Sequence, residues 1–124
     1  MDPYGVVQEL GDRLSAGDVD GAVALYEENA TFAVRPDEVV RGGEAIRAAL
    51  AQFAALEPRM EGEKVKVLEA GDTALVVNRW TLRGTTPDGQ PLEMAGTSAD
   101  VLRRQADGRW LVAIDDPWGG GGAN

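Results

Sequence analysis

Apolar residues recur at helical spacing in the first half of the chain, whereas apolar and polar residues alternate in much of the second half. One apolar stripe predicts a helix over residues 3–15. A second amphipathic segment predicts a helix over residues 19–28, capped at its start by Asp18. A third predicts a helix from residue 43 to Pro58, because proline cannot continue a helix.

β-Branched and aromatic residues, separated by glycine-containing turns, predict the strands. The expected strands cover residues 30–34, 39–40, 64–67, 74–86, 92–104 and 109–116. Helices gathered early and strands gathered late favour an α+β fold, with the helices on one face of an antiparallel sheet. We expect one domain over residues 1–118, followed by a disordered, glycine-rich tail at 119–124.

The composition narrows the chemistry that is open to this chain. It contains no cysteine and no histidine, which excludes disulfides, thiolate nucleophiles and imidazole bases or metal ligands. Any proton transfer must therefore use Asp, Glu, Tyr, Lys or water. No phosphate-binding loop, dinucleotide fingerprint or metal-ligand spacing is present, so we expect no cofactor and no metal.

Charge and hydropathy limit the partners. The net charge of −9 and the lack of a basic stripe argue against nucleic-acid binding. No apolar run approaches the roughly 20 residues that span a bilayer, and the N-terminus does not resemble a signal peptide. We expect a cytoplasmic protein that does not bind membranes.

Several segments carry a family resemblance. They are AGDVDGAVALYEENATF at residues 16–32, Arg41-Gly42 before residues 45–47, and the last two predicted strands. The chain resembles the ketosteroid isomerase and polyketide cyclase (SnoaL-like) branch of the nuclear transport factor 2-like superfamily. The resemblance implies a cone, in which a strongly curved sheet and three N-terminal helices enclose an apolar pocket. It also implies a homodimer formed through the outer face of the sheet.

The resemblance to ketosteroid isomerases extends to one of three catalytic positions. The tyrosine that helps to hold the oxyanion falls at Leu10, and the general base falls at Val34. The protonated aspartate of the oxyanion hole falls at Asp100, which is present. Without the base, isomerisation by that mechanism is not expected.

Strand alternation, taken from an inward-facing Asp100, predicts which other side chains point into the cone. It places Ser98, Asp115 and Arg79 inside, together with Val77. The predicted catalytic set is Asp100, Asp115 and Arg79. Limonene epoxide hydrolases, which share the fold, use an aspartate–arginine–aspartate set, and their base position falls at Thr81. Alternatively, these charged groups only satisfy one another.

The same alternation places the two strand tryptophans on the outer face, where Trp80 and Trp110 would form the dimer interface. Tyr26 is expected on the buried face of the second helix, and Trp118 at the pocket mouth. The residues expected to contact a ligand are Leu10, Tyr26, Val34, Leu50, Phe53, Val77, Ser98 and Trp118.

Three functions are compatible with these patterns. The first is cofactor-independent acid–base catalysis of isomerase, cyclase or epoxide-hydrolase type on a small hydrophobic molecule. The second is a non-catalytic protein that binds or carries such a molecule, and the third is a structural dimer whose cone is filled by side chains. The first is the main hypothesis, by analogy with the fold.

Overall fold

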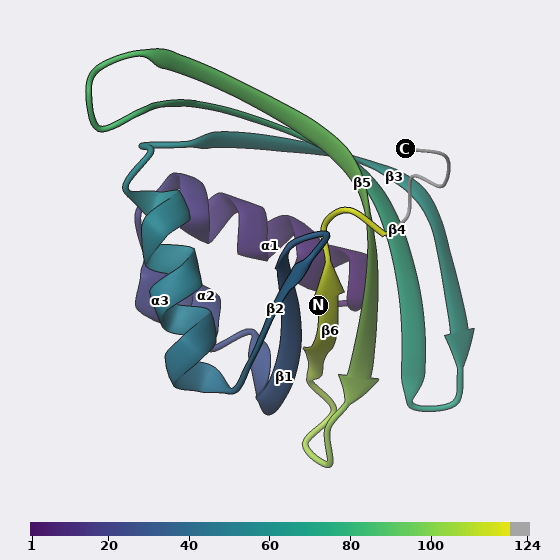
Figure 1. The fold of residues 1–124 in the computed structure, drawn as a ribbon. Coiled ribbons are helices and arrows are strands. Elements are labelled where there is room, and N and C mark those ends of the chain that lie inside the picture. Colours follow the sequence, from purple (N-terminus) through teal and green to yellow (C-terminus); the bar gives the residue numbers. More distant parts are fainter. Residues whose placement is uncertain (120–124) are drawn as a thin grey trace.

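A computed structural model describes residues 1–119, in which three helices lie against the concave side of one curved, six-stranded sheet (Figure 1). The helices are α1 (Pro3–Ser15), α2 (Val19–Val23) and α3 (Gly43–Ala54). The strands are β1 (Tyr26–Arg35), β2 (Glu38–Arg41), β3 (Arg59–Ala70), β4 (Thr73–Thr85), β5 (Pro91–Arg104) and β6 (Trp110–Asp116). The α+β class and the cone-like arrangement are confirmed.

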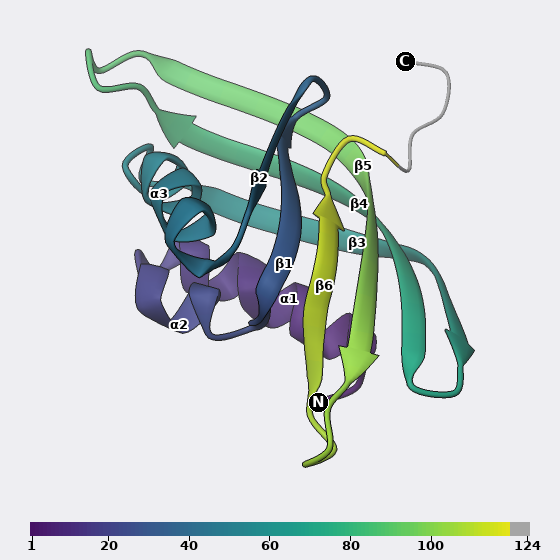
Figure 2. The same cartoon turned by 60° about the horizontal axis from the view of Figure 1, so that its bottom comes forward.

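The strand order in the sheet is β2-β1-β6-β5-β4-β3. All neighbours are antiparallel except β1 and β6, which run parallel. The long strands β3, β4 and β5 bend over the helices, and the sheet does not close into a barrel (Figure 2). The inner face of these strands is therefore turned toward the helices. No helix of residues 1–119 is long and apolar enough to cross a membrane. The tail predicted to be disordered lies outside the described residues, apart from Gly119.

Helix α1 packs against the inner side of β3 and β4. The Asp2 side chain caps it by accepting a hydrogen bond from the Gly5 amide at 2.7 Å, which satisfies a donor that has no partner inside the helix. Its apolar stripe, Val6, Leu10 and Leu14, is buried in the core. Because that stripe is anchored, the neighbouring face of the helix is presented to the inner side of β3 and β4.

The second helix is shorter than predicted, and Tyr26 lies on a strand rather than on a helix. Helix α2 ends at Val23, and Tyr26 begins β1 by pairing with Val112 of the parallel strand β6. The Val112 amide also donates to the Leu25 carbonyl at 2.8 Å. These long-range ladder bonds outweigh the local helical spacing, which is only a weak preference. Because Tyr26 lies on β1, its hydroxyl reaches Asp115 near the end of β6.

A bulge in β6 corrects the predicted orientation of Trp110. Val101 pairs with Ile114, but Leu102 pairs with Val112, so Ala113 is an extra residue in β6. Strict alternation fails at this residue. Asp115 and Trp110 therefore both face inward, and Trp110 belongs to the buried core.

The prediction for β4 is shifted by one residue. Val76 pairs with Asp100 and Asn78 with Ser98, so the even-numbered residues of β4 share the inner face with Asp100. Trp80 is therefore buried inside and cannot form an exposed dimer surface with Trp110, since each is only 7% exposed. The homodimer stays a prediction, but Trp80 and Trp110 do not form its interface.

Trp80 is held at the inner face from three sides. Its indole N–H donates to the Pro117 carbonyl at 2.8 Å, and its ring meets the Trp118 ring edge-on at a centroid distance of 5.3 Å. Opposite it on β5 lies Gly96, where an added Cβ would come within 2.8 Å of the Trp80 ring. The glycine is thus required by the close approach of the indole.

We predict that Gly96→Ala lowers the free energy of unfolding by about 1–3 kcal/mol, because the new methyl group displaces an indole that cannot move freely. Urea unfolding followed by tryptophan fluorescence measures the change. Gly43→Ala is the control, since a Cβ at that position meets nothing within 4 Å. Equal stabilities of the two variants would contradict this account of Trp80.

Candidate functional site

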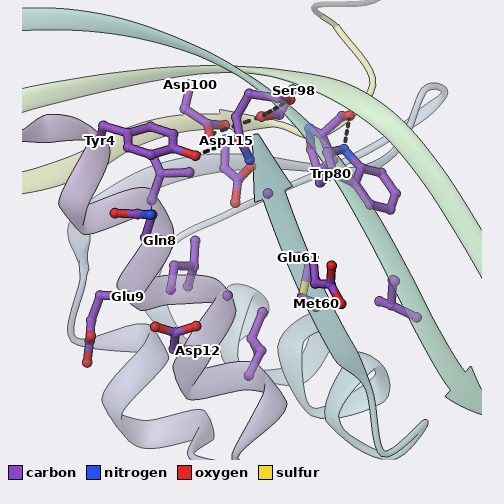
Figure 3. Close-up of a pocket in the computed structure, with 18 of the residues that line it drawn as sticks. Tyr4, Gln8, Glu9, Asp12, Met60, Glu61, Trp80, Ser98, Asp100 and Asp115 are labelled. Atoms are coloured by element: carbon purple, nitrogen blue, oxygen red, sulfur yellow. Dashed lines mark hydrogen bonds between the residues drawn. The ribbon is translucent and has the colours of Figure 1, made fainter. Parts of the chain in front are cut away.

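A cavity of about 700 Å³ lies between α1, α3 and the inner face of the sheet. This volume falls in the range of about 300–1,000 Å³ that is typical of small-molecule sites. Figure 3 shows it with Tyr4, Gln8, Glu9 and Asp12 on α1, Met60 and Glu61 on β3, and Trp80, Ser98, Asp100 and Asp115 on the strands beyond. The residues that line it thus come from two helices and from several strands of the sheet.

Two carboxyl groups lie side by side at the inner wall. Asp100 on β5 and Asp115 on β6 are directly opposed across the two strands, and only 4% and 7% of their surfaces are exposed. Each carboxyl group shifts the pKa of the other. Burial disfavours the charged form of each group, and two neighbouring negative charges repel one another, so the two groups cannot easily be ionised together.

The surroundings raise the pKa of both carboxyl groups. Burial raises the pKa of Asp100 well above its usual value, and the neighbouring Asp115 raises it further. Burial also raises the pKa of Asp115, but hydrogen bonds from Asp100 and Tyr26 counteract this effect. Both carboxyl groups therefore have a raised pKa, which favours retention of one proton by the pair.

Tyr26 completes this arrangement from β1. Its hydroxyl donates to Asp115 Oδ2 at 2.5 Å. Burial raises the pKa of Tyr26 well above 10.0, and the charge of Asp115 adds to the increase, so the hydroxyl remains a donor. On the other side, the Ser98 hydroxyl lies 3.4 Å from Asp100 Oδ2, and the Asp116 amide lies 3.3 Å from Asp100 Oδ1. The acid pair is thus held by groups from three strands.

The structure places most of the predicted ligand-contacting residues at the cavity. Those that line it are Leu10, Tyr26, Leu50, Phe53, Ser98 and Trp118, together with Asp100 and Asp115. Leu50 and Phe53 come from α3, opposite the acid pair. The location of these residues follows the sequence prediction, while their roles stay predictions.

Arg79 does not belong to the site, contrary to the prediction. Its side chain is 59% exposed and forms an ion pair with Glu63 at 2.6 Å on the outer face. It occupies an odd-numbered position of β4, so the register described above turns it away from Asp100. The aspartate–arginine–aspartate set of limonene epoxide hydrolases is therefore not formed at this cavity.

Val34 and Val77 also lie elsewhere. Val77 follows Val76 on β4 and has the outward orientation, opposite to that of Asn78. Val34 lines a second, smaller hollow of about 260 Å³. Phe53 and Trp118 line both hollows, and the Trp118 indole N–H donates to the Val34 carbonyl at 3.1 Å. Trp118 and Phe53 thus separate the two spaces.

Sequence reasoning missed two groups of lining residues. On α1, Tyr4, Gln8 and Asp12 follow one another at a spacing of four and so share a face, which the sequence shows directly. On β4, Asn78 and Trp80 line the cavity because the strand register is the reverse of the one expected. Asn78 becomes the main new polar residue of the wall.

The charged side chains of the wall have one sign. Among residues 1–119, no lysine or arginine side chain lines the cavity, whereas five carboxyl side chains do, namely Glu9, Asp12, Glu61, Asp100 and Asp115. The first three lie at or near the surface. In the same range of residues, no three acidic side chains are grouped so that they could hold a metal ion. The cavity thus favours a neutral ligand over an anionic one.

The family model of the SnoaL-like domain matches residues 7–113 of this chain. The matched range contains Tyr26, Asn78 and Asp100, whereas Asp115 and Trp118 follow its end. No functionally curated protein matches the sequence.

Solved structures with the same fold are distant in sequence. A ketosteroid isomerase-like protein from Erwinia carotovora is similar at 16% identity and a TM-score of 0.81, over 90% of this chain and 88% of the other. Aln2 from Streptomyces shares 24% identity at a TM-score of 0.75, over 91% and 84% of the two chains. A nuclear transport factor 2-like protein from Novosphingobium aromaticivorans shares 20% identity at a TM-score of 0.76, over 90% and 75%. At these identities the likeness shows the fold alone.

We predict that Asp100→Asn changes how stability depends on pH. Where the folded protein retains a proton that the unfolded chain has lost, the free energy of unfolding falls as pH rises, by about 1.4 kcal/mol per pH unit for one proton. The raised pKa of Asp100 places this window above its usual value of 3.8. The variant has no such proton, so its stability relative to the parent should increase with pH above 4.

Urea unfolding of both proteins between pH 4 and pH 8 measures this difference. Asp107→Asn is the control for the range above about pH 5.5, because hydrogen bonds from Arg109 lower the pKa of that exposed carboxyl group, which is then ionised in both the folded and the unfolded protein. Its stability relative to the parent should stay constant. A constant difference for Asp100→Asn as well would show that Asp100 is not protonated in the folded protein.

We also predict that the cavity rejects anions. Binding of 2-naphthoate should be at least about tenfold weaker than binding of 2-naphthamide, which has the same shape without the charge, and added salt should reduce the difference. Isothermal titration calorimetry measures both affinities. Equal or tighter binding of the carboxylate would contradict the proposed charge selection.

Proposed function

This chain belongs to the SnoaL-like domain family of the nuclear transport factor 2-like superfamily, and we propose that it is a cofactor-independent enzyme of isomerase or cyclase type. Its substrate is a small, neutral, hydrophobic molecule that carries a carbonyl group. The reaction is a proton transfer at the carbon next to that carbonyl, carried out by Asp100 and Asp115 and supported by Tyr26.

One arrangement supports the proposal, namely a buried carboxyl group with a raised pKa that lines a ligand-sized cavity. Asp100 is buried, its pKa is raised by burial and by Asp115, and it lines the cavity. A neutral carboxylic acid can donate a strong hydrogen bond to a carbonyl oxygen as negative charge develops there. This interaction strengthens toward the transition state, which is the requirement for catalysis.

The second carboxyl group supplies the complementary function. Asp115 is ionised when Asp100 holds the shared proton, and its pKa is also raised, which brings its basicity closer to neutral pH. In the proposed reaction Asp115 accepts a proton from the carbon next to the carbonyl and the electron pair moves onto the oxygen. The enol or enolate collapses when Asp115 delivers a proton to the same carbon or to a conjugated one, and a proton that exchanges with solvent while Asp115 holds it is replaced from the solvent. No proton is gained or lost in the cycle.

The catalytic positions proposed here differ from those of the ketosteroid isomerases that the chain resembles. The position of the oxyanion tyrosine is Leu10, an apolar part of the cavity wall, and the position of the base is Val34, outside the main cavity. The acid and the base would instead be neighbours on β5 and β6. Tyr26, from β1, takes part by holding the Asp115 carboxylate.

The second candidate function is non-catalytic binding of a small hydrophobic molecule. One observation favours it: the acid pair is already hydrogen-bonded to Tyr26, Ser98 and the Asp116 amide. A pair satisfied in this way can serve structure alone. The two functions differ in whether a bound ketone exchanges its protons.

We predict that the protein accelerates the exchange of the α-protons of 2-tetralone in deuterated buffer. The initial rate, followed by NMR, should fall at least about 100-fold in Asp100→Asn and in Asp115→Asn, because general acid–base catalysis typically contributes 10²–10⁴-fold. Arg79→Gln should retain the parent rate, since this residue lies on the outer face.

Binding of 2-tetralone by each variant completes the experiment. Retained binding with lost exchange supports catalysis by the acid pair. Binding without exchange in the parent protein would favour the carrier function. Exchange that survives both substitutions would show that Asp100 and Asp115 have no part in it.

A further inference from the structure

Asn78 is the one amide side chain on the inner face of β4, and its surroundings point to a ligand. It is only 7% exposed, lines the cavity and is flanked across the strands by Ser98. The Ser98 hydroxyl lies 3.3 Å from the Asn78 backbone carbonyl and 3.4 Å from Asp100. Asn78 therefore continues the polar strip of the acid pair along the wall.

The amide group is held in one orientation. The Tyr4 hydroxyl donates to Asn78 Oδ1 at 3.1 Å, so the oxygen already has a partner. Burial and the carboxylate of Glu63 raise the pKa of Tyr4, which keeps this hydroxyl protonated. Because Tyr4 belongs to α1, the hydrogen bond also ties the helix to β4.

The glycine beneath the amide provides the space that it occupies. Gly62 on β3 has no side chain, and an added Cβ there would lie 3.0 Å from both Nδ2 and Oδ1 of Asn78. Within residues 1–119 the nitrogen Nδ2 makes no hydrogen bond, and it is not among side-chain atoms sealed from solvent without a partner. Within this range it is thus a donor without a protein partner that keeps some accessible surface, on a residue that lines the cavity.

A free donor on a buried, oriented side chain is costly unless a ligand or water satisfies it. We propose that Asn78 is a ligand-binding residue, which donates a hydrogen bond from Nδ2 to a second oxygen of the substrate. The inference rests on the proposed function, because it assigns the carbonyl of the same molecule to Asp100.

The register sets the distance between the two recognition points. Asn78 lies diagonally across from Asp100, which separates such side chains by about 7–8 Å. The substrate class is therefore a neutral molecule with an oxygen at each end of a bicyclic or larger ring system. One oxygen is a ketone, and the other is an ether, hydroxyl or carbonyl that accepts a hydrogen bond.

Two probes of the same shape test this inference, 6-methoxy-2-tetralone and 6-ethyl-2-tetralone. They differ only in the oxygen that Asn78 would recognise. Calorimetry should show that the parent protein binds the methoxy compound about 3- to 10-fold more tightly, the value of one hydrogen bond. Asn78→Leu should abolish or reverse this preference, because leucine offers a similar volume without a donor.

Two further variants separate recognition from a structural effect. Gln8→Leu removes the other neutral amide of the cavity wall at an exposed position, where water competes for the donor, so the preference should be retained. Tyr4→Phe leaves Asn78 in place but releases its orientation, so the preference should shrink. If Asn78→Leu fails to fold, Tyr4→Phe still provides the test.

The inference and the proposed function can fail separately. Equal binding of the two probes by the parent protein, or no binding of either, would overturn the role of Asn78. A preference for the methoxy compound that persists in Asn78→Leu would do the same. The proposed function is decided by the exchange of 2-tetralone itself, which lacks the second oxygen.

Discussion

The burial of two carboxyl groups in contact is the constraint on which the rest of this site depends. Asp100 and Asp115 face one another across β5 and β6, and both are almost inaccessible to bulk water. Two ionised carboxylates in such a position would repel each other and lose their hydration, so the pair retains a proton. The hydroxyl of Tyr26 then stabilises the carboxylate that remains. In the proposed reaction the proton donor and the proton acceptor are thus the same kind of chemical group, and their surroundings distinguish them.

Three features of the fold outside the acid pair determine what surrounds Asp100 and Asp115: a bulge in β6, the early end of α2 and the position of α1. The extra residue Ala113 turns both Trp110 and Asp115 inward on one short strand, which packs the core at one end and the acid at the other. The early end of α2 releases Tyr26 to pair with β6. Helix α1 closes the cavity and, through Tyr4, fixes the amide of Asn78. Polar groups therefore lie along one strip of an otherwise largely apolar wall, where a ligand would be oriented by a small number of contacts.

Some features of the structure follow from the spacing of residues along the chain, whereas others depend on the pairing of distant strands. Periodicity identified most of the elements, because the burial of one face imposes a repeat of 3.6 or 2 on the residues that form it. With Asp100 taken as inward from the family resemblance, alternation also placed Asp115 and Ser98 at the cavity, where Leu50 and Phe53 were expected too. It failed for Arg79 because Val76 and Val77 are both apolar, so alternation alone does not orient β4. The hairpin turn between β4 and β5 fixes the orientation of β4. Because Thr85 pairs with Pro91, Val76 pairs with Asp100 and shares its face. A register is decided by the turn that joins two strands.

The sequence by itself determined the α+β fold, the absence of histidine and cysteine chemistry, and the presence of acidic residues at inward strand positions. These properties depend on composition and on spacing along the chain, which are local. Only the tertiary structure decided that Tyr26 contacts Asp115, that Arg79 lies outside, and that Asn78 joins the wall. Each of these results depends on a bulge, a register or a parallel pairing that joins distant segments. The free energy of such pairings comes from the whole sheet, so no short stretch of sequence specifies them.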